Sequence, residues 1–135
     1  MSRIIAREHI LKILYQVDFH DDYTLDEVID IHLENCVKDK LSDDDIGFIT
    51  NEVKGSRQHL KEIDEIIGHA SKGWKLNRMS RLDLTILRLA VYEIKFATEI
   101  PTNVAINEAI NLAKKYSGDH APSFINGVLG NIVNK

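Results

Sequence analysis

The sequence predicts an all-α protein, and three observations support this fold class. Apolar residues recur at spacings of three and four along the 135 residues, and no long stretch alternates with a period of two. Residues that interrupt helices are scarce, with only seven glycines and two prolines. No internal repeat or low-complexity linker divides the chain. We therefore expect a single domain, residues 1–135, built as one compact bundle of about seven helices.

Capping residues and apolar spacing predict two helices near the start of the chain. Ser2 has the position of an N-cap for a first helix that ends near residues 20–22, with an apolar stripe made of Ile10, Ile13, Leu14 and Val17. Thr24, followed three residues later by Glu27, forms a capping box that opens a second helix. The inner side of that helix is predicted to carry Leu25, Val28, Ile31 and Cys36.

A third helical region opens at Ser42 and Asp45. Its apolar positions indicate either two helices or one helix bent near Gly55-Ser56; these positions are Ile46, Ile49, Val53, Leu60, Ile63 and Ile67. A turn around Lys72-Gly73 is predicted to end the region and to bring in Trp74.

Three helices are predicted in the last part of the chain. Ser80 with Asp83 caps a helix whose apolar residues are Ile86, Leu87, Ala90, Val91 and Ile94. Pro101 starts the next helix and Gly118 ends it. A last helix runs from about Ser123 to Val133.

Polar residues interrupt the apolar pattern of these later helices. A buried polar group without a partner costs about 1–3 kcal/mol, so such residues either lock helices together or face a ligand. We assign a structural role to Arg88, Glu93, Asn107, Glu108 and Asn126. Phe124 and Asn126 lie about 200° apart around a helix, so they cannot point the same way. We expect the Asn126 amide to tie helices together and Phe124 to face outward.

The charge of the chain is unevenly distributed. The formal net charge is −4. Between Asp18 and Ile46, eleven acidic residues stand against Lys38 and Lys40, which gives this segment −9 and leaves +5 for the remainder. One part of the chain is therefore acidic and the rest basic. This distribution fits either nucleic-acid binding by the basic part or two solvated faces.

The sequence offers no recognisable catalytic or metal-binding motif. The six histidines form no His-x-x-x-His pair, and Cys36 is the only cysteine. Gly127 and Gly130 are not followed by the Gly-Lys-Ser/Thr of a phosphate-binding loop. We therefore predict neither an enzyme nor a metal or cofactor. Since the sequence contains no signal peptide and no apolar run long enough to span a membrane, we expect a cytoplasmic protein without a membrane role.

Side chains suited to RNA gather near both ends of the chain. RNA binding uses cations for phosphates and aromatic planes for unstacked bases. The first group, projecting from the first helix, is Arg3, Arg7, Lys12 and Tyr15, in which the two arginines are one helical turn apart. The second group, around the junction of the last two helices, is Lys114, Lys115, Tyr116, His120, Ser123, Phe124 and Asn126. We predict that both groups contribute to one salt-sensitive surface for single-stranded RNA, with Asn126 in its structural role. The alternatives are a solvated face for the first group and core packing for Tyr15 and Phe124.

Four separated motifs fall in order along nearly the whole chain. They are Ser2–Glu8 followed by Ile13-Leu14-Tyr15-Gln16; Trp74, Leu76 and Arg78 followed by Leu82-Asp83 and Ile86-Leu87-Arg88; Asn107-Glu108-Ala109; and Phe124-Ile125-Asn126-Gly127-Val128-Leu129. As an ordered set these motifs resemble those of the NusB family of transcription antitermination factors, which are small helical RNA-binding proteins. In this family the first helix carries an arginine-rich motif that contacts RNA. Here Ile4 and Ile5 occupy places where relatives often have Arg, so the motif is diluted.

The resemblance also implies partners. NusB-like proteins form a heterodimer with a small-subunit ribosomal protein, called NusE in this role, and the pair binds the boxA element of nascent RNA. In the transcription elongation complex this promotes processive transcription, especially of ribosomal RNA operons. We place the surface for the protein partner near Arg78, Asp83 and Leu84.

Two other functions stay open on the sequence. The same helical domain occurs fused to RNA cytosine methyltransferases, although 135 residues leave no room for a cofactor-binding domain as well. The second alternative is a helical dimerisation module without an RNA role. Some relatives self-associate, and the sequence does not decide between a monomer and a homodimer.

Overall fold

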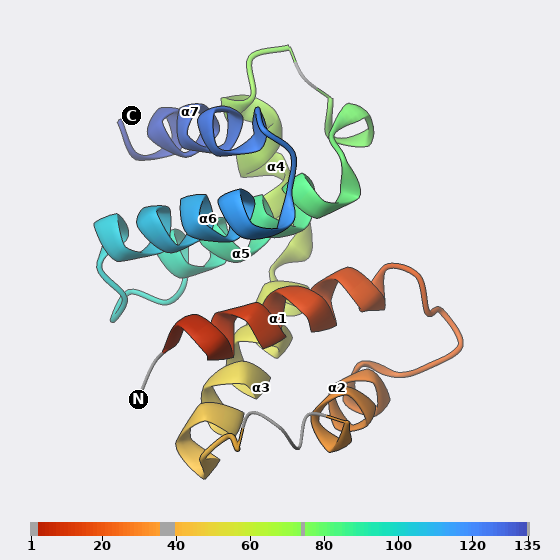
Figure 1. The fold of residues 1–135 in the computed structure, drawn as a ribbon. Coiled ribbons are helices and arrows are strands. Elements are labelled where there is room, and N and C mark those ends of the chain that lie inside the picture. Colours follow the sequence, from red (N-terminus) through yellow and green to blue (C-terminus); the bar gives the residue numbers. More distant parts are fainter. Residues whose placement is uncertain (1–2, 36–39, 74, 135) are drawn as a thin grey trace. The chain divides into compact units, whose positions relative to one another are not determined.

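The computed structural model describes residues 3–35, 40–73 and 75–134. In this part of the chain every regular element is helical, as the sequence predicts. The elements are α1 (Arg3–Val17), α2 (Leu25–Glu34), α3 (Asp43–Gln58), α4 (Leu60–Ala70), the 3₁₀ helix η2 (Leu76–Arg78), α5 (Arg81–Lys95), α6 (Thr102–Tyr116) and α7 (Ala121–Val133) (Figure 1). The predicted cap at Ser2 and the predicted positions of Cys36 and Trp74 lie outside the described residues.

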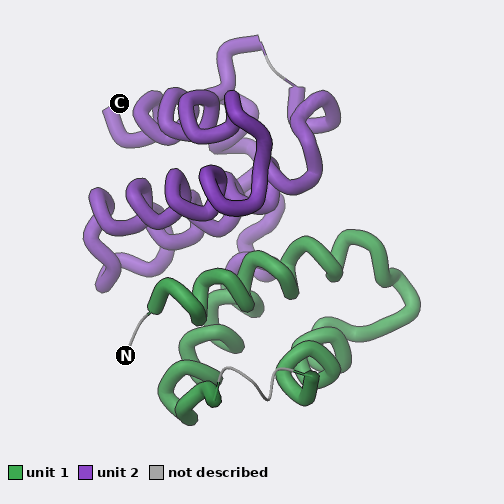
Figure 2. Tube along the Cα trace, in the orientation of Figure 1, with its two compact units in different colours: residues 1–55 green, residues 56–135 purple. Residues whose placement is uncertain are grey.

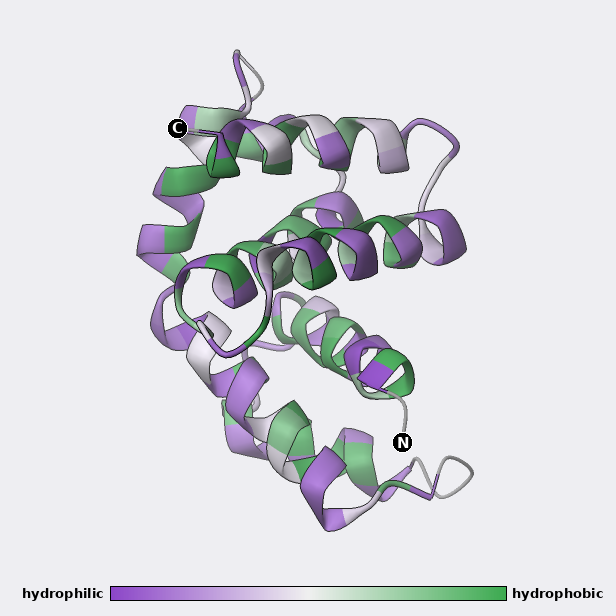
Figure 3. Cartoon of the chain, turned by 90° about the vertical axis from the view of Figure 1, so that its left-hand side faces the viewer, coloured by the Kyte–Doolittle hydropathy of each residue, from purple (hydrophilic) through white to green (hydrophobic). Residues whose placement is uncertain are grey.

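The chain divides into two compact units. Unit 1 comprises Met1–Gly55 and unit 2 comprises Ser56–Lys135 (Figure 2). Apolar and polar residues alternate around the helices of both units (Figure 3), as amphipathic helices require.

The starts of the helices in unit 1 follow the predicted capping residues. The Thr24 hydroxyl accepts a hydrogen bond from the backbone N–H of Glu27, and the Glu27 carboxylate accepts one from the N–H of Thr24, which completes the capping box. The Ser42 hydroxyl accepts from the N–H of Asp45 at 3.1 Å, and the Asp45 carboxylate accepts from the N–H of Ser42. Two of the four orphan N–H groups are thus bonded at the start of α2 and of α3.

Two apolar residues of unit 1 face outward against prediction. Ile31 in α2 is 45% exposed and Ile46 in α3 is 36% exposed. The buried positions of α2 are Val28 and Ile29, so its inner face is rotated from the predicted one. The core of α1 agrees with the prediction, because Ile10, Ile13 and Leu14 are buried.

The third helical region consists of two helices, and the break lies at His59 rather than at Gly55-Ser56. His59 has non-helical dihedral angles (φ −101°, ψ 17°) at the N-cap position of α4. Its ring stacks on Phe96 of α5, with centroids 4.1 Å apart and planes 11° apart, and its Nδ1 lies 3.1 Å from the Glu62 carboxylate. These contacts hold the start of α4 against the end of α5.

Helix α5 is the central element of unit 2 and packs against α4, α6 and α7. Ile86, Leu87 and Val91 are fully buried, as their spacing predicts. The Ser80 hydroxyl caps the helix by accepting from the N–H of Asp83 at 3.0 Å. The turn before η2 places Lys72 and Gly73 at positive φ.

The last two helices differ little from their predicted bounds. Pro101 is the N-cap of α6, and the helix ends at Tyr116, two residues before Gly118. Helix α7 begins at Ala121, two residues earlier than predicted, with Pro122 in its first turn.

Candidate nucleic-acid interface

In unit 1, Arg3 and Arg7 share one face of α1, as their spacing predicts, and both lie over the ring of Phe48 from α3. Their guanidinium carbons are 4.1 and 5.5 Å from the ring centroid. Arg3 also forms ion pairs with Asp44 at 3.1 Å and Asp45 at 3.5 Å. Only 5% of Arg7 is exposed, so the prediction that it projects from the helix is wrong. The Arg3 side chain is partly exposed, but its guanidinium is already paired with two carboxylates.

Farther along α1, Lys12 and Tyr15 are exposed, as predicted. The Tyr15 ring lies 5.0 Å from the ring of Phe19, which is 56% exposed. Sequence reasoning missed Phe19, although its position four residues after Tyr15 is the signal that could have found it. Together these two rings form an aromatic surface beside a cationic side chain, a combination suited to stacking unpaired bases.

In unit 2 the second predicted group gathers around the α6–α7 junction. Lys114 and Lys115 occupy the last turn of α6 and are exposed, and the Lys115 Nζ lies 5.4 Å from the Tyr116 ring centroid. His120 and Ser123 are exposed, while Tyr116 and Phe124 are half-buried. The cations of this group therefore face solvent.

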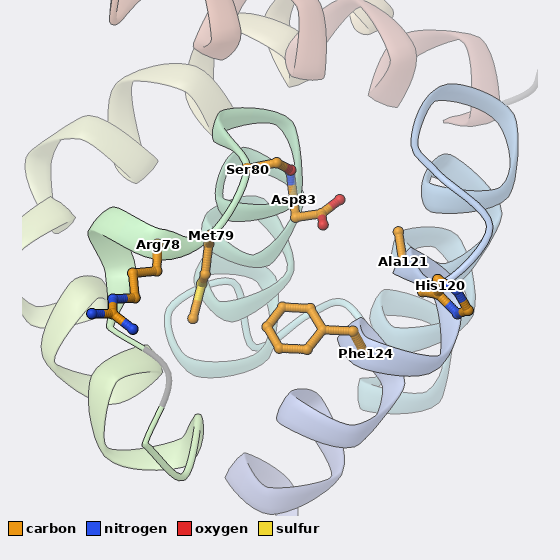
Figure 4. Close-up of a pocket in the computed structure, with 7 residues that line it drawn as sticks. All are labelled: Arg78, Met79, Ser80, Asp83, His120, Ala121 and Phe124. Carbon is orange, nitrogen blue, oxygen red and sulfur yellow. The ribbon is translucent and has the colours of Figure 1, made fainter.

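A pocket of about 230 Å³ lies between the start of α5 and the start of α7. We call it the Phe124 pocket; it is lined by Arg78, Met79, Ser80, Asp83, His120, Ala121 and Phe124 (Figure 4). The pocket thus combines residues predicted for the protein partner, Arg78 and Asp83, with residues predicted for RNA, His120 and Phe124. Leu84, the third residue predicted for the partner, is only 4% exposed and lies outside this lining.

Asp83 is held in place by two neighbouring segments. Its backbone N–H donates to the Ser80 hydroxyl, and its carboxylate Oδ1 accepts a short hydrogen bond from the hydroxyl of Ser117, the C-cap of α6. In Figure 4 the carboxylate points toward the segment that carries His120 and Ala121. The start of α5 and the end of α6 therefore fix the carboxylate at the edge of the pocket.

Of the five polar residues predicted to be structural, Arg88 and Glu93 are largely buried and two of the others are exposed. Arg88 donates from Nε and Nη2 to the two carboxylate oxygens of Asp64 at 2.8 and 2.9 Å, which joins α5 to α4. Glu93 is 1% exposed. Asn107 and Asn126 are exposed and Glu108 is half-buried, so the prediction that Asn126 points inward to tie helices together is wrong.

The amide that joins α7 to the end of α4 belongs to Asn131. Its Nδ2 donates to the carbonyl oxygen of Ala70 at 2.9 Å. The start of α7 at Ala121 and its 3.6-residue period place Asn126 on the solvent side. A second asparagine five residues later meets the neighbouring helix instead.

The described residues contain no group of three or more His, Cys, Asp or Glu side chains that could hold a metal ion. In the same part of the chain, no helix combines the length and apolarity needed to cross a membrane.

The fold and these surfaces define a class of protein: an all-α domain that displays cations, aromatic rings and a small pocket. The sequence profile of the NusB family matches residues 4–134. The chain therefore belongs to the NusB family of transcription antitermination proteins, which is not an enzyme family. This confirms the resemblance seen in the sequence and the prediction of a non-catalytic function.

Individual relatives agree with this membership. The chain is 44% identical over 132 residues to the transcription antitermination protein NusB of Agathobacter rectalis, covering 96% of this chain and 97% of the relative. It superposes on the solved structure of T. maritima NusB with a TM-score of 0.90 and 31% identity, covering 100% of this chain and 92% of the other. A structure of the antitermination factors NusB and NusE in complex with dsRNA matches with a TM-score of 0.85 and 26% identity, over 99% and 98% of the two chains.

Proposed function

We propose that this protein binds boxA-type single-stranded RNA together with a small-subunit ribosomal protein in the role of NusE, and so promotes processive transcription of ribosomal RNA operons in the cytoplasm. Membership in the NusB family and the likeness to a NusB chain solved with NusE and RNA support this function. The observation that carries it is the exposure of Lys12, Tyr15 and Phe19 in unit 1 and of Lys114 and Lys115 in unit 2.

Each side chain has a role that follows from its chemistry. Lys12, Lys114 and Lys115 neutralise phosphates, which release counterions on binding. Tyr15 stacks on unpaired bases, as does the neighbouring Phe19. Arg3 reaches phosphate after it leaves its carboxylate partners, whereas the buried Arg7 contributes by supporting Phe48, over which Arg3 lies.

The protein partner docks near the start of α5 in this proposal. Arg78 is exposed, and its guanidinium points away from Phe124 in Figure 4, which suits a contact outside the pocket. Leu84 is buried, so it supports this surface from below rather than touching the partner. A basic ribosomal protein in this place would extend the cationic track available to RNA.

Fluorescence anisotropy with a short single-stranded RNA tests the proposal. We expect affinity to fall with salt, and the Lys114→Ala/Lys115→Ala variant to lose about 0.7 in the log–log salt slope for each phosphate contact removed. A matched control, Lys61→Ala/Lys95→Ala, removes two other exposed lysines of unit 2 and should keep the slope. Equal slopes for wild type and both variants would contradict a role for the α6 lysines, and the absence of any RNA affinity, with or without the ribosomal protein, would favour a dimerisation module.

A further inference from the structure

The Phe124 pocket has no assigned occupant, and its lining combines an aromatic ring, apolar walls and one oriented carboxylate. We propose that it receives one unpaired RNA base with an exocyclic amino group, cytosine in preference to uracil, and that Asp83 is the residue that selects this base. This inference rests on the proposed RNA binding and deepens it, since it names the base and the residue that recognises it.

The size of the pocket suits a single planar group. Pockets for drug-sized ligands measure about 300–1,000 Å³. At about 230 Å³ the Phe124 pocket is smaller, so a single base fits it better than a larger ligand. Met79, Ala121 and Phe124 supply apolar walls, and the Phe124 ring points from α7 toward Met79 (Figure 4). A flat heterocycle can stack on this ring.

The carboxylate of Asp83 gives the pocket its selectivity. An ionised carboxylate only accepts hydrogen bonds, and it pairs with the N4 amino group of cytosine. Oδ1 of Asp83 already accepts from Ser117, and Oδ2 bonds to no residue that the structure describes. An amino group entering the pocket meets an oriented acceptor, whereas the O4 of uracil would face a negative charge.

Two exposed lysines close in sequence to Ser117, the hydrogen-bond partner of Asp83, suit an RNA ligand. Lys114 and Lys115 precede Ser117 by three and two residues, and both are exposed. Exposed cations attract the phosphates that flank a base. A polyanion that carries a hydrogen-bond donor on its base can use both the Asp83 carboxylate and these lysines.

The test compares RNAs that differ by one amino group. A short oligouridylate receives either one cytosine or one 2-pyrimidinone, which lacks the N4 amino group, and its affinity for the intact protein is measured by anisotropy, with the ribosomal partner added where needed. For wild type we expect the cytosine RNA to bind about 5-fold tighter, the lower end of the discrimination a base-edge contact provides.

Three variants isolate the contribution of the Asp83 carboxylate to this preference. Asp83→Asn retains the acceptor for Ser117 but presents an amide N–H₂ to the base, so the preference for cytosine should disappear. Ser117→Ala removes the hydrogen bond that orients the Asp83 carboxylate, and it should lower the preference for the cytosine RNA to about 2-fold. Asp119→Asn removes an exposed charge from the same loop and serves as control, because it should raise all RNA affinities alike while the ratio stays at about 5. Thermal melting confirms that each variant is folded.

The outcomes are distinguishable. Loss of the ratio in Asp83→Asn but not in Asp119→Asn supports the inference. A ratio near one for wild type, with salt-sensitive RNA binding intact, overturns it while the proposed function stands. A ratio retained in Asp83→Asn overturns the role of Asp83. A variant that loses affinity for the ribosomal protein while its base ratio stays at the wild-type value assigns the pocket to the protein partner, which also overturns the inference.

Discussion

The two units use their apolar residues differently. Among the described residues, unit 1 exposes seven large hydrophobic side chains, whereas unit 2 exposes only Val104. Of the residues that the structure describes, unit 2 buries twenty hydrophobic residues and unit 1 buries nine. Unit 2 is thus mainly a packed scaffold that also carries the Phe124 pocket, while unit 1 leaves more of its large apolar and aromatic side chains exposed to solvent.

One ion pair from each unit shows a similar contrast in exposure. The Lys54–Asp26 pair of unit 1 has side chains that are 52% and 72% exposed, whereas those of the Arg88–Asp64 pair in unit 2 are 13% and 27% exposed. Water screens the exposed Lys54–Asp26 pair strongly, and it screens the less exposed Arg88–Asp64 pair much less. The free energy of unfolding should therefore respond more strongly to changes at the buried positions of unit 2 than to changes at the exposed positions of unit 1.

The largest expected effect contrasts a buried isoleucine with an exposed one. Ile125 of unit 2 is fully buried, so Ile125→Ala should lower the free energy of unfolding by about 3 kcal/mol through lost burial and a cavity. Ile31 of unit 1 is 45% exposed, and Ile31→Ala should change it by no more than about 0.5 kcal/mol. Urea unfolding measures both. Equal losses would contradict the contrast between the units.

The second contrast concerns the ion pairs. Arg88→Ala leaves Asp64 without its two charged hydrogen bonds and should lower the free energy of unfolding by about 2 kcal/mol. Lys54→Ala should cost no more than about 0.5 kcal/mol, since its pair is exposed. If the arginine variant melted at the wild-type temperature, the Arg88–Asp64 pair would be a surface contact and not a support of unit 2.

A smaller effect separates two asparagines of α7. Asn131→Ala removes the hydrogen bond to Ala70 and should lower the free energy of unfolding by about 1 kcal/mol. Asn126→Ala removes an exposed side chain and should leave thermal melting unchanged. The reverse result would restore the role that the sequence predicts for Asn126.

The smallest expected effect concerns the ion pair between Asp44 and Arg3. Asp44→Asn weakens the ion pair with Arg3, and we expect RNA affinity to rise about 3-fold because the guanidinium becomes available to phosphate. Asp43→Asn removes an exposed neighbouring charge and serves as the control. Anisotropy titrations of both variants decide the matter, and an equal gain for the two would show a general charge effect instead.

Local signals in the sequence predict much of this fold. Thr24, Ser42 and Ser80 start helices as predicted, because an N-cap depends only on residues within one turn. Four ordered motifs also identified the family. Rotation of a helix about its axis is harder to predict, and Ile31 shows why: the packing partner decides which side faces inward.

The candidate site was predicted less completely. The side chains of Lys12, Lys114 and Lys115 are exposed, as predicted, although their role in RNA binding stays a prediction. Arg7 is buried and lies over the ring of Phe48, which is far from it in sequence, and periodicity within α1 cannot show this contact. The Phe124 pocket joins residues from 78 to 124, so it becomes visible only in the folded chain.

The central claim is that RNA and the ribosomal protein bind to this protein together. Calorimetric titrations in both orders test it most directly. With a coupling free energy of about 1–3 kcal/mol, each ligand should tighten binding of the other by the same factor, about 5- to 150-fold. Equal affinities with and without the second ligand would contradict the claim, since the two sites would then be independent.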